Sequence, residues 1–117
     1  VHGIDLYYAV EMPDIVMLVH PVGTGLGAAN YSDYLVVYQN CTVGSTDNGI
    51  YPKFCGGTVL YSGVSVVGDC LIGEDVVFGA NAFVLSTEIP ANTTVIGQYP
   101  NHRLLANATT VRQKVFQ

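Results

Sequence analysis

Charged side chains are scarce in this sequence: nine acidic and four basic residues stand among 117, or 11%. A soluble domain usually carries about a quarter. A disordered chain is rich in charge and poor in apolar residues, so an apolar content of 50% excludes disorder. Four basic residues are too few for a patch that binds a phosphate backbone, which excludes a nucleic-acid partner. The apolar surface must be covered by a membrane, a partner chain or further copies.

Long apolar runs are also missing. The longest stretch without a formal charge, residues 15–32, contains His20, Pro21 and three glycines. A spanning helix needs about 20 mainly apolar residues, so we expect no membrane partner. The opening residues, Val1–Gly3, show neither the basic nor the apolar region of a signal peptide. A cytoplasmic location is therefore expected.

Cysteines are few, and their number is odd: Cys41, Cys55 and Cys70. They do not make a disulfide framework. Cys41 and Cys70 stand at positions that are otherwise apolar in a six-residue repeat, where cysteine acts as a small hydrophobe. No cluster of cysteine and histidine has the spacing of metal ligands, so no metal is expected.

What the sequence does contain is that repeat of six residues, which is clearest from Leu60 onward. The first position of successive blocks is large and apolar: Leu60, Val66, Ile72, Phe78 and Val84. The fifth position is small or β-branched: Val64, Cys70, Val76 and Ala82. Glu88 breaks the rule in the next block.

A period of six matches neither helical spacing nor simple strand alternation. With recurring glycine, asparagine and aspartate for turns, it predicts short strands around a triangular coil. Three blocks make a coil of about 18 residues, so 117 residues predict about six stacked coils in an all-β fold. We expect a single domain over residues 1–117, with a protruding loop at 44–57 and a short C-terminal tail at 97–117.

These residues resemble a known family, the hexapeptide-repeat acyltransferases, which form left-handed parallel β-helices. The likeness is greatest to serine acetyltransferases and their sugar-modifying relatives, and it covers residues 3–103. The matching pieces are Ile4-Asp5, Met17-Leu18-Val19-His20, Cys41-Thr42-Val43-Gly44, Tyr51-Pro52-Lys53-Phe54, the sixes from Leu60, and Gly97 through Arg103.

The resemblance implies transfer of an acetyl group from acetyl-CoA to a hydroxyl, with His20 as general base and Asp5 as its orienting partner. A base with a pKa near neutrality is worth roughly 10²–10⁴-fold for such a poor nucleophile. The interval from Asp5 to His20 is slightly shorter than one coil. Neighbouring coils could therefore place the two side chains on one edge.

The substrate loop departs from the family. Serine acetyltransferases carry an aspartate before the base, and Val19 stands there in this chain. Their loop reads Arg-His-Pro-Lys, where this chain reads Ile50-Tyr51-Pro52-Lys53. Val19, Tyr51 and Lys53 remain the candidate substrate contacts, and Tyr51 either donates a hydrogen bond to the acceptor or packs the loop. A free amino acid needs charged partners, so we expect a sugar hydroxyl or a related metabolite rather than serine.

For the cofactor, the resemblance implies pantetheine along the seam between two subunits of a homotrimer. The matching positions are Gly44 and Ser45 near the thioester, Ser62 and Ala80 along the seam, and Arg103 for the CoA phosphates. Backbone N–H groups beside Gly44 and Ser45 could stabilise an oxyanion. Ser62 and Ala80 could equally be small because turns require it.

Three other functions remain open at this point. The chain could be a β-helix scaffold or binding module without catalysis, a serine acetyltransferase proper, or an enzyme that acylates an amine.

Overall fold

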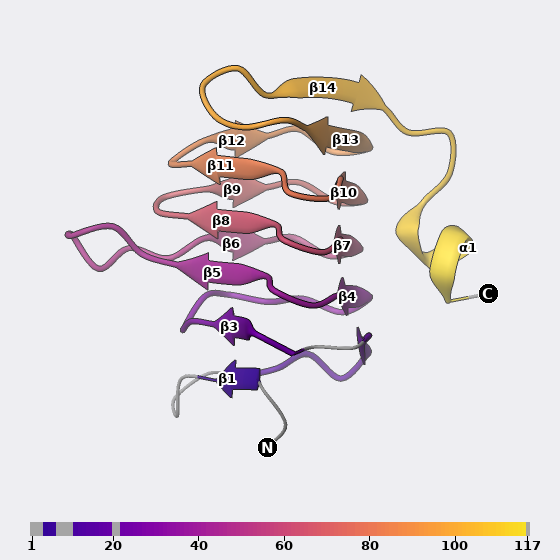
Figure 1. Cartoon of the computed structure of the whole chain (residues 1–117). Helices are drawn as coiled ribbons and strands as arrows, with labels where there is room; N and C mark the ends of the chain where they lie inside the picture. The colour runs from indigo at the N-terminus through magenta and orange to yellow at the C-terminus, as the bar shows by residue number, and fades with distance from the viewer. Residues whose placement is uncertain (1–3, 7–10, 20–21, 117) are drawn as a thin grey trace.

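The structure, a computed structural model, describes residues 4–6, 11–19 and 22–116, and short strands dominate these residues (Figure 1). The strands form three sheets, here called A, B and C. Sheet A contains β1 (Ile4–Leu6), β3 (Thr24–Leu26), β5 (Thr42–Gly44), β8 (Ser65–Val67) and β11 (Phe83–Leu85). Sheet B contains β2 (Val16–Leu18), β4 (Leu35–Val37), β7 (Thr58–Leu60), β10 (Val76–Phe78), β13 (Thr93–Ile96) and β14 (Arg103–Ala106). Sheet C contains β6 (Lys53–Phe54), β9 (Leu71–Ile72) and β12 (Glu88–Ile89).

The chain passes through sheets A, C and B in turn, and each passage makes one coil of a β-helix. The described residues hold four complete coils from β3 to β13, with Asn30, bridged to Lys53, in the sheet C position of the first. The prediction of about six coils was therefore wrong. It divided the whole chain by the length of one coil, whereas the loop after β5 and the segment after β13 lie outside the coils.

Equivalent positions of successive coils stack inside the β-helix. In sheet A, Leu26, Val43, Val66 and Val84 pair in register, and each is at most 2% exposed. The residues predicted for the first and fifth repeat positions are buried in the same way, which confirms the six-residue period. Full burial of one such side chain is worth about 1.5–3 kcal/mol, so each ladder of buried positions stabilises the stack.

The exception at Glu88 has a simple cause. Val66 pairs with Val84 in the next coil, and Ile72 pairs with Ile89. The number of residues from Ile72 to Ile89 is one fewer than the number from Val66 to Val84. The corner before β12 therefore lacks a residue that the preceding coil has. Ile89 moves into the buried position and Glu88 is exposed.

The corner between sheet B and sheet A requires a left-handed backbone in each coil. Gly23, Asn40, Gly63 and Asn81 occupy it with φ of 74, 58, 77 and 63°. Glycine and asparagine tolerate this conformation better than other residues. A side chain at Gly63 would overlap the carboxamide of Asn81 in the next coil, and one at Gly23 would overlap that of Asn40. The two residue types alternate because each asparagine uses the space left by a glycine.

The protruding loop is shorter than predicted. Residues 45–52 leave the stack between β5 and β6 (Figure 1). The predicted loop extended to residue 57, but Lys53 and Phe54 form β6 and pair with Leu71 and Ile72 of β9. The chain therefore returns to the coil directly after Pro52.

The segment after β13, predicted as a short tail, forms two elements. Strand β14 runs antiparallel to β13 and ends the stack, and helix α1 (Val111–Val115) returns along sheet B (Figure 1). Its apolar side completes a second buried cluster on the outer face of that sheet, made of Val36, Val59, Val77 and Val111. Among the described residues, no helix has the length and apolar character needed to cross a membrane. That residues 1–117 form a single domain stays a prediction.

Candidate active site

Of the two predicted catalytic residues, Asp5 lies within the described residues and His20 lies outside them. The backbone of Asp5 is in β1, in register with Gly25 of β3. The described segments that flank His20 are fixed to the next coil: the Val19 N–H donates to the Val37 carbonyl at 2.8 Å, and the Asn40 N–H donates to the Val22 carbonyl at 2.9 Å. The pairing of Asp5 with His20 stays a prediction.

Three other candidates share the corner between sheets B and A. Val19 follows β2, Ser62 follows β7 and Ala80 follows β10. The Asn81 N–H donates to the Ser62 carbonyl at 2.9 Å, so Ser62 and Ala80 belong to stacked turns. Ala80 is exposed, whereas Ser62 and Val19 are half-buried. The chain thus brings two cofactor candidates, Ser62 and Ala80, to the corner at which Val19 also lies.

Gly44 and Ser45 lie at the opposite end of sheet A. Gly44 is the last residue of β5 and pairs with Val67, and Ser45 begins the protruding loop. A Cβ at Gly44 or at Gly25 would meet no atom within 4 Å, so the outer face of sheet A is open there. A strand of three residues, about 10 Å long, separates them from the corner that holds Ser62. Within one chain, the cofactor candidates therefore lie at the two opposite ends of the strands of sheet A.

Tyr51 packs where the protruding loop returns to the coil. Its ring lies so close to Gly27 that a Cβ at that position would overlap it. The Tyr31 hydroxyl donates to the Gly27 carbonyl at 2.8 Å, and its ring stacks on Phe54 with 5.6 Å between centroids. Burial, and to a smaller degree Tyr51, raises the pKa of Tyr31 above its ordinary value. The structure therefore gives Tyr51 a packing contact, and a hydrogen bond from its hydroxyl to an acceptor stays a prediction.

The two cationic candidates are elsewhere. Lys53 is exposed in β6 of sheet C. Arg103 is exposed at the start of β14, opposite Ile96, just after a loop in which Gln98 bridges to Phe83 of sheet A. The described residues of one chain do not gather either side chain with Ser62 and Ala80.

Sequence reasoning missed several residues that shape these corners. Asn40 and Asn81 alternate with glycines one coil apart, and that alternation was a readable signal. Gly27, which makes room for Tyr51, stood in the glycine-rich stretch 23–27 without a partner to suggest its role. In the described part of the chain, no group of three or more His, Cys, Asp or Glu residues could hold a metal ion.

Comparisons with known proteins agree with the fold described above. No model of a known protein family matches the chain. It is 29% identical over 99 residues to a serine acetyltransferase of Synechococcus elongatus, which covers 81% of this chain and 40% of that protein. A serine acetyltransferase structure from Vibrio cholerae superposes with a TM-score of 0.82 at 26% identity, covering 92% of this chain and 42% of that one. A serine acetyltransferase in complex with CoA superposes with a TM-score of 0.76 at 24% identity, over 87% of this chain and 42% of that one.

The fold and the repeat thus define a left-handed parallel β-helix of the hexapeptide-repeat class, as the sequence predicted. Within that class the chain is serine acetyltransferase-like, which confirms the resemblance to the hexapeptide-repeat acyltransferases. The chain spans less than half the length of the Synechococcus and Vibrio proteins.

Proposed function

We propose that this chain is an acetyl-CoA-dependent O-acetyltransferase that transfers an acetyl group to a small hydroxyl acceptor. The observation that carries the proposal is the similarity to serine acetyltransferases over 81% of the chain, in sequence and in fold. A solved serine acetyltransferase of the same fold is a complex with CoA, which supports CoA as the product bound here.

In this mechanism His20 removes the proton from the acceptor hydroxyl, and Asp5 holds its imidazole in the required orientation. The hydroxyl oxygen then attacks the thioester carbonyl, and the C–S bond breaks to release CoA. The proton on His20 passes to the departing thiolate. Backbone N–H groups beside Gly44 and Ser45 stabilise the oxyanion that forms at the carbonyl.

The cofactor lies between two copies of the chain in a homotrimer. The cofactor candidates lie at opposite ends of the strands of sheet A: Ser62 and Ala80 before the strands, Gly44 and Ser45 at their far end. Helix α1 covers sheet B. A closed three-fold assembly sets an edge of one copy against a neighbouring copy. Arg103, the first residue of β14, contributes the charge for the CoA phosphates.

Serine takes precedence over a sugar as the proposed acceptor, because the relatives are named serine acetyltransferases. The expectation of a sugar rested on Val19 and on the Ile50–Tyr51 pair, which do not supply the charged groups that bind an amino acid in the family. Those departures predict weak serine binding. They are the reason to test hydroxyl sugars beside serine. A cytoplasmic location also stays an expectation.

The purified chain, acetyl-CoA and a panel of acceptors test the proposal, with loss of the thioester absorbance as the readout. We expect turnover with serine, and a fall in kcat of at least about 10²-fold in His20→Ala with an unchanged circular dichroism spectrum. Asp5→Asn should lower kcat less, and Asp14→Asn, an exposed carboxylate before β2, serves as its control. Light scattering measures whether the active species is a trimer.

Two results would contradict the proposal. Full activity of His20→Ala would remove the general base. An absence of turnover with every acceptor, together with an absence of thermal stabilisation by acetyl-CoA or CoA, would favour a scaffold without catalysis.

A further inference from the structure

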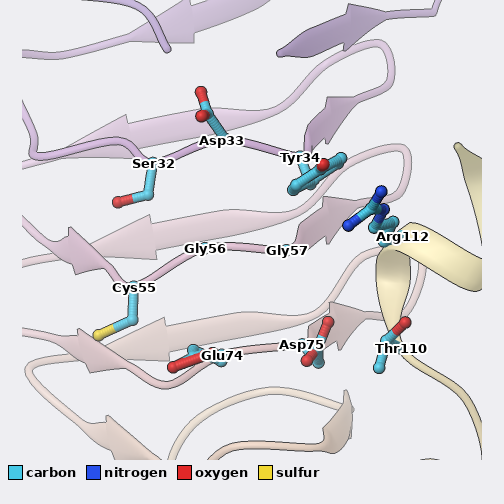
Figure 2. A pocket seen from close by; sticks show the side chains of 10 residues that line it. All are labelled: Ser32, Asp33, Tyr34, Cys55, Gly56, Gly57, Glu74, Asp75, Thr110 and Arg112. Carbon is cyan, nitrogen blue, oxygen red and sulfur yellow. The ribbon is translucent and has the colours of Figure 1, made fainter. Parts of the chain in front are cut away.

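A groove of about 460 Å³ lies on the corner between sheet C and sheet B, apart from every residue proposed for acetyl transfer (Figure 2). Its volume is within the range of small-molecule sites. Corner residues of three successive coils line it, and helix α1 closes one end with Thr110 and Arg112.

Two glycines of the middle coil form the floor of the groove. Gly56 and Gly57 follow β6, with φ of 130 and 68°. The Gly57 N–H donates to the Asp33 carbonyl at 2.9 Å, and the Asp75 N–H donates to the Gly56 carbonyl at 3.0 Å, so the three coils are directly stacked. The coils on both sides carry side chains at the equivalent positions, whereas Gly56 and Gly57 carry none, and Cys55 is the side chain of the middle coil that lines the groove (Figure 2). A Cβ at Gly56 would meet no atom closer than 3.7 Å, so the groove is open there, whereas a Cβ at Gly57 would lie 2.7 Å from Asp75 Oδ1.

Groups of opposite charge lie at the two ends of this floor. Glu74 is exposed on the coil below, and its carboxylate lies beside the Cys55 end of the groove (Figure 2). Arg112 projects from α1 at the other end, with its guanidinium carbon 5.4 Å from the centre of the Tyr34 ring. Within the described residues, Arg112 pairs with that ring and not with a carboxylate.

The other two carboxylates at this corner have structural partners. Asp33 Oδ1 accepts the Ile15 N–H at 3.2 Å, and its side chain points away from the glycine floor (Figure 2). Asp75 Oδ1 accepts the Val111 N–H at 3.0 Å, which fixes the start of α1. Glu74 and Arg112 are therefore the charged groups that remain for a ligand.

We infer that this groove binds a free α-amino acid as a zwitterion, with the ammonium at Glu74 and the carboxylate at Arg112. The two-residue floor spans at most about 7 Å. A ligand that contacts both ends must therefore carry its two charges close together, as an amino and a carboxyl group on one carbon do. A guanidinium fork matches a carboxylate in shape as well as in charge.

Glycine, the smallest such zwitterion, tests this inference in a titration of the full chain followed by NMR of the Gly56 and Gly57 amides. These amides report the groove alone, because the proposed acetyl-transfer residues lie on other corners. We expect these amide shifts to saturate with glycine. N-acetylglycine and glycinamide each lack one charge, so the Kd from their titrations should be at least about tenfold higher.

Glu74→Gln and Arg112→Gln should each raise the Kd for glycine at least about tenfold. Glu88→Gln in β12 and Lys114→Gln on α1 remove exposed charges outside the groove and should leave the Kd unchanged. Arg112→Lys keeps the positive charge. It therefore distinguishes the effect of losing that charge from the effect of displacing helix α1. It should bind glycine more tightly than Arg112→Gln.

Unshifted Gly56 and Gly57 amides at about 10 mM glycine, ten times a Kd of about 1 mM, would overturn the inference. Equal binding of glycine and its two singly charged analogues would overturn it as well. Neither result bears on acetyl transfer, since that activity is measured as loss of the thioester in the wild type and in His20→Ala.

Discussion

The carboxamide of Asn81 fills the space that a side chain at Gly63 would need, one coil away at the corner between sheets B and A. Both residues have a left-handed backbone, with φ of 63 and 77°. The turn that carries Ser62 is therefore shaped by a residue of the neighbouring coil. Its geometry depends on a pair of residues that are distant in the sequence and adjacent in the stack.

Gly63→Ala should destabilise the fold by at least about 1–2 kcal/mol, because alanine is strained at positive φ and its Cβ overlaps Asn81. The double variant with Asn81→Gly removes the overlap and should recover part of the loss. Urea unfolding measures both. Gly44→Ala, whose Cβ would meet open space, is the matched control and should be close to neutral. A Gly63→Ala protein as stable as the wild type would show that the corner relaxes freely.

Substitutions at Tyr51 separate packing from hydrogen bonding. Tyr51→Phe keeps the ring against Gly27, so if packing is its role, kcat and KM should stay within about twofold of the wild type. Tyr51→Ala removes the ring, and KM for the acceptor should rise because the loop at 45–52 loses its anchor. If the phenylalanine variant instead loses activity as strongly as the alanine variant, the hydroxyl itself contacts the acceptor.

Tyr31→Phe should cost about 1 kcal/mol at neutral pH, because the Gly27 carbonyl loses its hydrogen bond. The difference from the wild type should shrink as the pH rises above about 10. The sign follows from the raised pKa of Tyr31: the unfolded chain ionises this phenol near its ordinary value, whereas the folded chain keeps it neutral, so alkali favours unfolding of the wild type. Urea unfolding between pH 7 and pH 11 measures this. A constant difference would mean that Tyr31 ionises alike in both states.

The three cysteines should differ sharply in reactivity. Cys41 and Cys70 are buried, and burial raises the pKa of both thiols, so less reactive thiolate is present at a given pH. Cys55 is exposed. A thiol reagent at pH 8 should label Cys55 rapidly in the native protein and reach the other two only in denaturant. Rapid native labelling of Cys55→Ser would contradict this assignment.

The repeat made the fold predictable, because each buried position is repeated with the same residue type. Leu60, Val66, Ile72, Phe78 and Val84 could be assigned to the core from the sequence alone, and all five are buried. The number of coils was harder to predict, because corners can gain or lose residues without changing the pattern in the strands. The loop at 45–52 and the short corner before Glu88 both did so.

Helix α1 was missed although its sequence held a signal. Thr110 and Gln113 form a capping box, and Val111 and Val115 are spaced as on one face of a helix. The groove could not have been predicted, because Gly56 and Gly57 read as ordinary loop residues. Only the stacking of three coils shows that these glycines lie between the coil that carries Asp33 and the coil that carries Glu74. His20 and Asp5 were proposed through the resemblance, and their pairing stays a prediction.

The unequal coils have a practical consequence. Leu26 pairs with Val43 and Val43 pairs with Val66, and the second interval is the longer because it includes the protruding loop, yet the buried ladder continues without a shift. Register is therefore set by the strand beneath and not by counting along the chain. Corners of this protein should accept grafted segments, so a new binding loop could be installed at 45–52 while the hydrophobic interior keeps its order.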